Sequence, residues 1–141
     1  MLLCCYNKNF LKKLYDDKIS IQLRSILSSG LLTGKYNCNT IFKDPLRSRL
    51  TEKRNRKKFT KRVNMSIKIF EFIKKKYSLP SEHIPIFLYS LFENLDNVKC
   101  VVRGGSSMHQ MKDNLKSFKI KHSDRKELFD LMETSWSCEY V

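Results

Sequence analysis

A strand, a glycine turn and a helix follow one another late in the chain, and this order favours folds in which strands and helices alternate. Residues 98–102 form a short apolar run rich in β-branched side chains. Gly104 and Gly105 follow, and glycine lets a backbone approach a ligand closely or take a positive φ. Ser107 stands three residues before Gln110, which is the capping-box spacing at a helix start. The pattern is typical of an anion-binding turn and equally of an ordinary capped helix.

A second strand is predicted at residues 18–25, where Ile19, Ile21 and Leu23 alternate with polar residues and so share one face. A short amphipathic helix is predicted before it, at 9–15. Two strands separated by helices indicate a parallel α/β arrangement, in which the strands are joined by a crossover. Further helices are predicted at 65–77, 82–95, 108–117 and 124–133.

A long basic loop is predicted over residues 36–62. Its first part has no periodicity and contains Pro45, and nine Lys or Arg side chains lie between Arg47 and Arg62. Such a run favours either a polyanion-binding surface or a solvated segment. Phe59 is its one aromatic residue, whereas single-stranded nucleic-acid sites usually interleave several stacking aromatics. A small basic nucleic-acid-binding protein that uses residues 47–62 is therefore the alternative interpretation, and nucleic acid is the less favoured partner.

Composition narrows the class of protein. The 141 residues suffice for one domain, and the apolar share of 41% suffices for a core. The net charge of +14 favours phosphate-bearing partners, although an AT-rich coding sequence would also produce it. The five cysteines form no C-x-x-C pair, which indicates free thiols and no metal site. No signal segment or membrane-length apolar run is recognised, so we expect a cytoplasmic protein with no membrane partner.

Four segments in sequence order resemble motifs of the aldo-keto reductase family. Residues 24–36 (RSILSSGLLTGKY) resemble the family loop Y-S-P-L-x-x-G-L-L-T-G-K-Y. Residues 74–81 resemble K-K-Y-G-x-S-P-A, and residues 102–114 resemble I-x-G-A-S-S-x-x-Q-L-x-E-N. Residues 118–124 resemble the closing F-x-L-S-x-E. The resemblance extends over roughly residues 6–133.

The resemblance implies an α/β fold that is the C-terminal portion of a (β/α)8 TIM barrel. The chain would supply the last two strands with their helices, leaving the barrel incomplete. It also implies NADP as cofactor, with residues 25–29 along the nicotinamide and pyrophosphate. Lys35 would reach a phosphate, helped by Arg47 or Arg49. The implied cofactor residues on this side are Ser25, Ile26, Leu27, Ser28, Ser29, Lys35, Arg47 and Arg49.

The glycine turn would hold the other end of the cofactor. The resemblance places Gly104, Ser106 and Gln110 at the 2′-phosphate of the adenosine, and Asp113 and Asn114 at the adenine. Hydroxyls, backbone N–H groups and cations beyond the C-terminal ends of barrel strands suit that chemistry. The chain contains no acidic residue between 102 and 112 of the kind that holds a free ribose hydroxyl, so NADP(H) is expected over NAD(H).

The chain departs from the family in several places. Ile26 replaces the usual Pro, Gly105 replaces a common Ala, and Arg103 could add a cation beside the phosphate. The catalytic Tyr, Asp, Lys and His of the family have no counterpart, so no catalytic residue is assigned. We therefore expect residues 1–141 to be a partial aldo-keto reductase domain that is inactive alone. It would be a truncated gene product, a decayed copy, or one piece of a split gene that needs a second chain to supply the rest of the barrel for carbonyl reduction.

Overall fold

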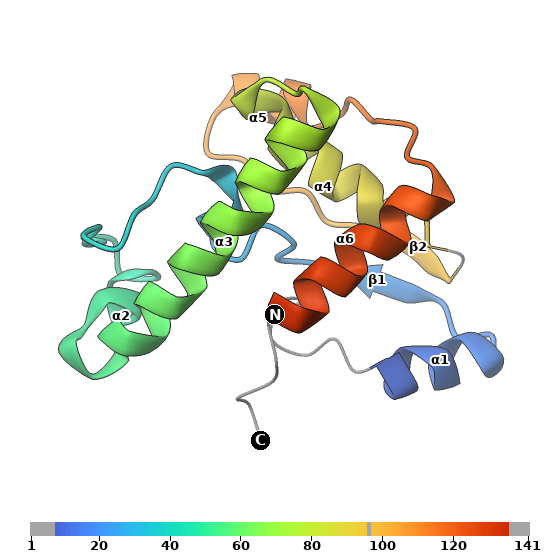
Figure 1. Cartoon of the computed structure of the whole chain (residues 1–141), viewed down its shortest axis with the longest axis horizontal. Coiled ribbons are helices and arrows are strands. Elements are labelled where there is room, and N and C mark those ends of the chain that lie inside the picture. The colour runs from blue at the N-terminus through green and yellow to red at the C-terminus, as the bar shows by residue number, and fades with distance from the viewer. Residues whose placement is uncertain (1–7, 96, 136–141) are drawn as a thin grey trace. The chain divides into compact units, whose positions relative to one another are not determined.

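The computed structural model describes residues 8–95 and 97–135, and these form two compact units. One unit contains the described residues up to Ser28 and those from Pro85 onward, and the other contains Ser29–Ile84. We call them the discontinuous unit and the inserted unit. The elements in chain order (Figure 1) are α1 (Lys8–Asp16), β1 (Ile21–Leu23), the 3-10 turn η1 (Leu31–Thr33), α2 (Ser48–Thr51), the 3-10 turn η2 (Lys53–Asn55), α3 (Arg56–Tyr77), the 3-10 turn η3 (Ser81–His83), α4 (Ile84–Glu93), β2 (Val98–Val101), α5 (Met108–Asp113) and α6 (His122–Ser135).

The two strands of the discontinuous unit pair in parallel, as the sequence predicts. Ile21 lies opposite Val98 and Leu23 opposite Val101, with an irregularity in the register after Ile21. The pairing therefore confirms the α/β class and the helical crossover between two neighbouring strands. Only three residues of the predicted 18–25 strand, Ile21–Leu23, form the observed strand. Ile21 and Leu23 are partly buried, whereas Ile19 is 47% exposed and does not share their face.

Helix α4 is buried on nearly all sides, as its apolar sequence predicts. The Ser90 hydroxyl donates to the carbonyl of Ile86 at 3.0 Å and accepts from the amide of Phe118 at 2.9 Å. The Phe118 and Phe87 rings lie 6.0 Å apart between centroids. The segment after α5 is thereby attached to α4, and α6 adds its own apolar residues, with Leu128 and Met132 buried.

The inserted unit has a small core beneath its loops. Leu31, Phe42, Phe59 and Val63 form a buried cluster, and partly buried side chains including Tyr36 pack against it. The Phe42 ring meets Tyr36 and Phe59 edge to face, at centroid distances of 4.9 and 5.9 Å. Such pairs stabilise a core beyond the area that they bury.

Helix α3 is longer than the sequence predicts. It begins at Arg56 where the prediction began it at 65, so the predicted 36–62 loop contains α2, η2 and the first two turns of α3. Lys and Arg are good helix formers, and Phe59, Val63, Ser66, Phe70 and Ile73 continue one buried face at helical spacing. The helix ends at Tyr77, before Ser78 in a left-handed conformation.

The other helix boundaries differ from the predictions by a few residues. Helix α5 ends at Asp113, where the prediction extended it to 117. Helix α6 spans His122–Ser135, where the prediction placed it at 124–133. Within the described residues, no helix is both long and apolar enough to cross a membrane.

Candidate functional site

The two segments that resemble cofactor-binding motifs leave the sheet at the same edge. β1 and β2 are parallel, and the amide of Val102 donates to the carbonyl of Leu23 at 2.7 Å, just beyond the paired residues. Residues 24–28 therefore continue from the carboxyl end of β1, and residues 102–107 from the carboxyl end of β2 (Figure 1). Ligands of parallel α/β proteins bind at this edge.

The segment after β1 contains strained serines. Ser25 and Ser28 have φ of 61° and 49°, and the amide of Ser28 donates to the carbonyl of Ser25 at 2.9 Å. A left-handed conformation costs a non-glycine residue roughly 1 kcal/mol. Residues in such conformations are often found at functional sites. Ile26 is 1% exposed and anchors the segment, so its side chain is not available to a ligand, while Leu27 is half-buried.

In the glycine turn, the donors of Ser106 converge on one acceptor. Its amide nitrogen and its hydroxyl lie 2.8 and 3.0 Å from the Oε1 atom of Gln110. The Ser107 hydroxyl accepts from the backbone N–H of Gln110 at 3.2 Å, so the predicted Ser cap is confirmed. An N–H and an O–H that already share one oxygen are arranged as they would be around an oxygen of a phosphate.

Gly104 is held from two sides. Its amide donates to the Tyr89 hydroxyl at 3.1 Å, and its carbonyl accepts from the Asn114 side-chain amide at 2.7 Å. A Cβ built on Gly104 would meet no atom within 4 Å, so one side of the peptide is open. Asn114, which the resemblance assigned to the adenine, is 8% exposed, and its Nδ2 atom already donates to the turn.

Arg103 does not offer its charge to a ligand, contrary to the sequence-based expectation. Its Nε atom donates to Glu93 at 2.8 Å, and its two other nitrogens contact Glu93 and the carbonyls of Asn114 and Lys116. The guanidinium lies 5.4 Å from the centroid of the Tyr89 ring. With its side chain only 14% exposed, Arg103 is part of the support of the turn.

Asp113 is also paired within the protein. Its carboxylate oxygens lie 3.1 Å from the His109 Nε2 atom and 2.8 Å from the Lys116 Nζ atom. The pairs are i,i+4 and i,i+3 contacts of one helix and its end, where exposed ion pairs contribute only a few tenths of a kcal/mol. These two pairs therefore contribute little to the stability of the turn.

The remaining predicted residues lie in the inserted unit. Ser29 has φ of 57°, and Lys35 and Arg49 are exposed. Arg47 is committed to the protein: it pairs with Asp44 at 2.8 Å, donates to the Tyr36 hydroxyl at 2.7 Å and lies over the Phe42 ring. Of the two arginines that the resemblance offered, Arg49 is the available one.

Asp44 lies beside Arg47. Burial acts to raise the pKa of Asp44, but the hydrogen bonds and charge of Arg47 outweigh it and hold that pKa below its ordinary value. Asp44 therefore stays ionised beside Arg47 at neutral pH, which supports a structural role for Arg47.

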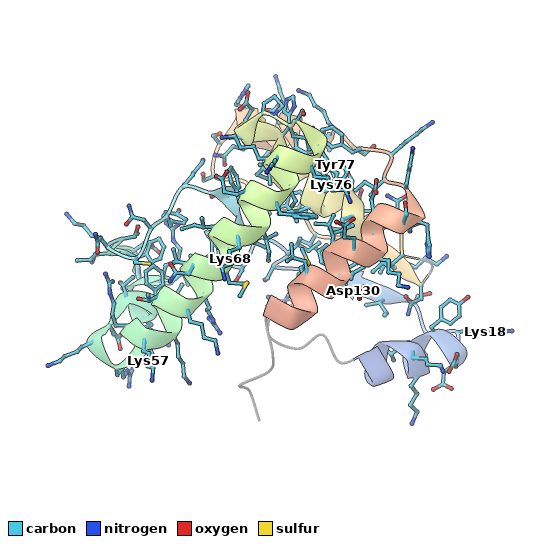
Figure 2. The ribbon with its side chains drawn as sticks, in the orientation of Figure 1. Lys18, Lys57, Lys68, Lys76, Tyr77 and Asp130 are labelled. Atoms are coloured by element: carbon cyan, nitrogen blue, oxygen red, sulfur yellow. The ribbon has the colours of Figure 1, made fainter. Side chains whose placement is uncertain are left out.

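The surface formed by residues 47–62, proposed as an alternative nucleic-acid site, presents no aromatic side chain among its described residues. Phe59 is 2% exposed and belongs to the core, so it cannot stack on a base. Arg56 donates to the carbonyls of Thr40 and Cys38, and Arg54 pairs with Glu52. Other cations project from α3, and Figure 2 labels two exposed examples, Lys57 and Lys68. The nine basic residues of this stretch are Arg47, Arg49, Lys53, Arg54, Arg56, Lys57, Lys58, Lys61 and Arg62.

Two residues of the discontinuous unit were not predicted from sequence. Tyr89 and Glu93 lie on α4, whose apolar pattern identified it only as a core helix. Their spacing could have identified them as a pair, because residues four apart share a helix face. The hydroxyl of a buried tyrosine also needs a hydrogen-bond partner.

No protein-family model matches the chain, and no similar curated protein or solved structure was found. The resemblance to aldo-keto reductases therefore stays a prediction that rests on the four motifs. No group of three metal-binding side chains occurs within residues 8–95 and 97–135. Within the discontinuous unit, the donors of Ser106 and the open face of Gly104 are chemically suited to an oxygen of a phosphate.

Proposed function

We propose that this chain is the NADP(H)-contacting, C-terminal part of an aldo-keto reductase barrel. In this proposal β1 and β2 are the last two barrel strands. One observation carries the proposal: the parallel pairing of β1 and β2 brings both motif segments to one edge of the sheet. In such folds that edge is where cofactors bind.

Each segment contributes different chemistry. Ser106 supplies an N–H and an O–H to the 2′-phosphate. The side-chain amide of Gln110 rotates, so that its Nε2 atom donates to the phosphate and its Oε1 atom no longer accepts from Ser106. Gly104 leaves its open face to the ligand, and Asp113 exchanges its surface pairs for the adenine. Ser25 and Ser28 line the nicotinamide side. In the inserted unit, the exposed cations Lys35 and Arg49 are the residues that the resemblance assigns to the phosphates.

NADPH, when bound, supplies the hydride for reduction of a carbonyl, and the chain's own residues bind and orient it. The acid that protonates the carbonyl oxygen would come from a second chain or another segment that completes the barrel, because no residue here matches the family's catalytic set. The chain alone is expected to bind NADP(H) without turning over a carbonyl substrate.

A titration of the full chain with NADPH and NADH, followed by nicotinamide fluorescence or calorimetry, tests the proposal. Replacing both Ser106 and Gln110 with Ala removes charge-assisted hydrogen bonds worth about 1.5–3 kcal/mol each, less some coupling. We expect NADPH to bind more tightly than NADH, and the double variant to lose at least about tenfold in NADPH affinity. A matched control replaces Ser117 and Gln22 with Ala, since both are exposed and lie outside the turn.

Equal affinity for the two cofactors would overturn the assignment of the 2′-phosphate to this turn. An equal loss in the control would show that the effect is not local. Absence of NADPH binding, both to the chain alone and to the chain mixed with a polypeptide that supplies the remaining barrel strands, would overturn the proposal as a whole.

A further inference from the structure

We propose that Arg103 is a positioning residue: with Glu93 and Tyr89 it fixes the glycine turn in its ligand-ready shape and does not itself touch the ligand. This inference rests on the proposed function for what the turn binds. Its structural part, that Arg103 determines the shape of the turn, can be tested separately.

Arg103 connects segments that are distant in sequence. It stands at the start of the turn, directly after β2, and its guanidinium binds the Glu93 carboxylate at the end of α4. The same group reaches the carbonyls of Asn114 and Lys116, which follow the end of α5. Arginine is suited to this position because its planar group presents several donors at once, which a lysine cannot match.

Tyr89 connects Arg103 to Gly104. The Arg103 guanidinium lies over the Tyr89 ring, whose hydroxyl bonds both the N–H and the C=O of Gly104, at 3.1 and 3.4 Å. The Asn114 side chain holds the same carbonyl, while the Asn114 backbone is held by Arg103. Gly104 is therefore fixed by the side chains of Tyr89 and Asn114, and Arg103 contacts the ring of Tyr89 and the backbone carbonyl of Asn114.

A ligand role for Arg103 predicts the opposite result from a positioning role in one variant. Glu93→Gln removes a negative charge and releases the guanidinium. If Arg103 bound a phosphate, this change would strengthen NADPH binding. If Arg103 positions the turn, the same change loosens Gly104 and weakens both NADPH and NADH, because misplacement affects every contact that the turn makes.

The test uses the full chain labelled with ¹⁵N only at glycine. The chain has four glycines, so its amide spectrum contains four peaks, of which Gly104 and Gly105 report on the turn. Gly30 and Gly34 lie in the inserted unit and serve as internal controls. The variants are Glu93→Gln, the charge-preserving Arg103→Lys and the mild Tyr89→Phe. Glu71→Gln, an exposed carboxylate of α3, is the control for loss of one charge.

We expect the Gly104 and Gly105 peaks to shift or broaden in all three variants while the Gly30 and Gly34 peaks stay in place. Both cofactors should bind about tenfold more weakly to Glu93→Gln and Arg103→Lys, with the NADPH-to-NADH ratio kept within about twofold. Unchanged Gly104 and Gly105 peaks in Arg103→Lys and Glu93→Gln would overturn the proposal. So would tighter NADPH binding by Glu93→Gln, or a loss of NADPH affinity alone in Arg103→Lys.

The two proposals can fail separately. If the wild-type glycine peaks do not respond to NADPH, either in the chain alone or in the chain mixed with a polypeptide that supplies the remaining barrel strands, the proposed function is wrong. The unliganded spectra of the variants still decide whether Arg103 fixes the turn. If the variants lose only thermal stability, with glycine peaks and affinities unchanged at a temperature where all are folded, Arg103 merely stabilises the fold and its positioning role is wrong.

Discussion

Gly34 packs directly against the ring of Phe70: a Cβ built on Gly34 would lie 2.6 Å from two of its ring atoms. Gly34 also has φ of 72°, a conformation that side-chain-bearing residues rarely adopt. Gly34 is the second glycine of the G-L-L-T-G motif. Its positive φ and its contact with Phe70 explain, within the inserted unit, why a glycine stands at this position. The ring of Phe70 is 7% exposed and has little freedom to move away.

We expect Gly34→Ala to lower the free energy of unfolding by about 2–4 kcal/mol, the sum of left-handed strain and overpacking. Urea denaturation followed by circular dichroism measures the change. Gly104→Ala is the matched control, because an added Cβ there meets no atom within 4 Å. We expect that control to stay within about 1 kcal/mol of wild type. Similar losses in the two variants would contradict the packing of Gly34 against Phe70.

Tyr89 should make stability depend on pH in the alkaline range. Burial raises the pKa of its hydroxyl, and this outweighs the opposing effects of the Gly104 hydrogen bond and the Arg103 charge. An unfolded tyrosine has a pKa of about 10, so below that pH both states hold the proton and the contribution to stability is complete. As the pH rises above about 10, the unfolded state loses its proton first, and the free energy of unfolding falls.

The measurement compares wild type with Tyr89→Phe by urea denaturation at about pH 8 and pH 11. Wild type should lose more stability than the variant between these values, because phenylalanine has no proton to lose. All other titrating groups are common to both proteins and cancel in the comparison. A loss of equal size in the two proteins would contradict the raised pKa of Tyr89.

Self-association should occur when the chain is alone in solution. Among the described residues the sheet has only two strands, so its outer edges are unpaired, and such edges favour edge-to-edge pairing. Leu46 and Leu115 are 90% and 84% exposed and add apolar surface. We expect analytical ultracentrifugation to show concentration-dependent association, reduced in Leu46→Gln/Leu115→Gln with stability within about 0.5 kcal/mol. A monodisperse, cooperatively melting wild type would contradict this.

Nucleic acid should bind weakly and without sequence preference. Phe59 is in the core, and Arg47, Arg54 and Arg56 are occupied by protein partners. The exposed cations of this stretch, among them Arg49, Lys53 and Lys57, contribute charge without base stacking, and such affinity for phosphates falls steeply with salt. Fluorescence anisotropy with a labelled oligonucleotide should show binding that decreases by at least about tenfold between 50 and 200 mM salt. Tight, sequence-selective binding at the higher concentration would favour the alternative function instead.

The parallel strand pair can be predicted from the sequence because each strand is marked by a pattern of apolar residues, which the many charged residues do not obscure. Alternation marks β1, an apolar run before glycines marks β2, and the helical residues between them require a crossover. The same reasoning predicts the buried helix α4 and the Ser107 cap. These features depend on local periodicity or on one fixed spacing, both of which can be read from residue types alone.

The start of α3 is missed because charge hides the periodicity. Lys and Arg fill its first two turns, and the run was interpreted as loop although Phe59 and Val63 are four apart and continue the face of Ile73. The role of Arg103 is missed for a different reason. Whether a cation faces a ligand or a carboxylate depends on a partner ten positions away, Glu93, and sequence spacing does not fix that contact.

The division of the chain has a consequence for how it folds during synthesis. The inserted unit is continuous, so Ser29–Ile84 can collapse as soon as it leaves the ribosome. β1 is made earlier but has no pairing partner until Val101 has emerged, and contacts between such distant residues form slowly. For that interval β1 lacks its partner strand, and an unpaired strand edge is open to pairing with other chains.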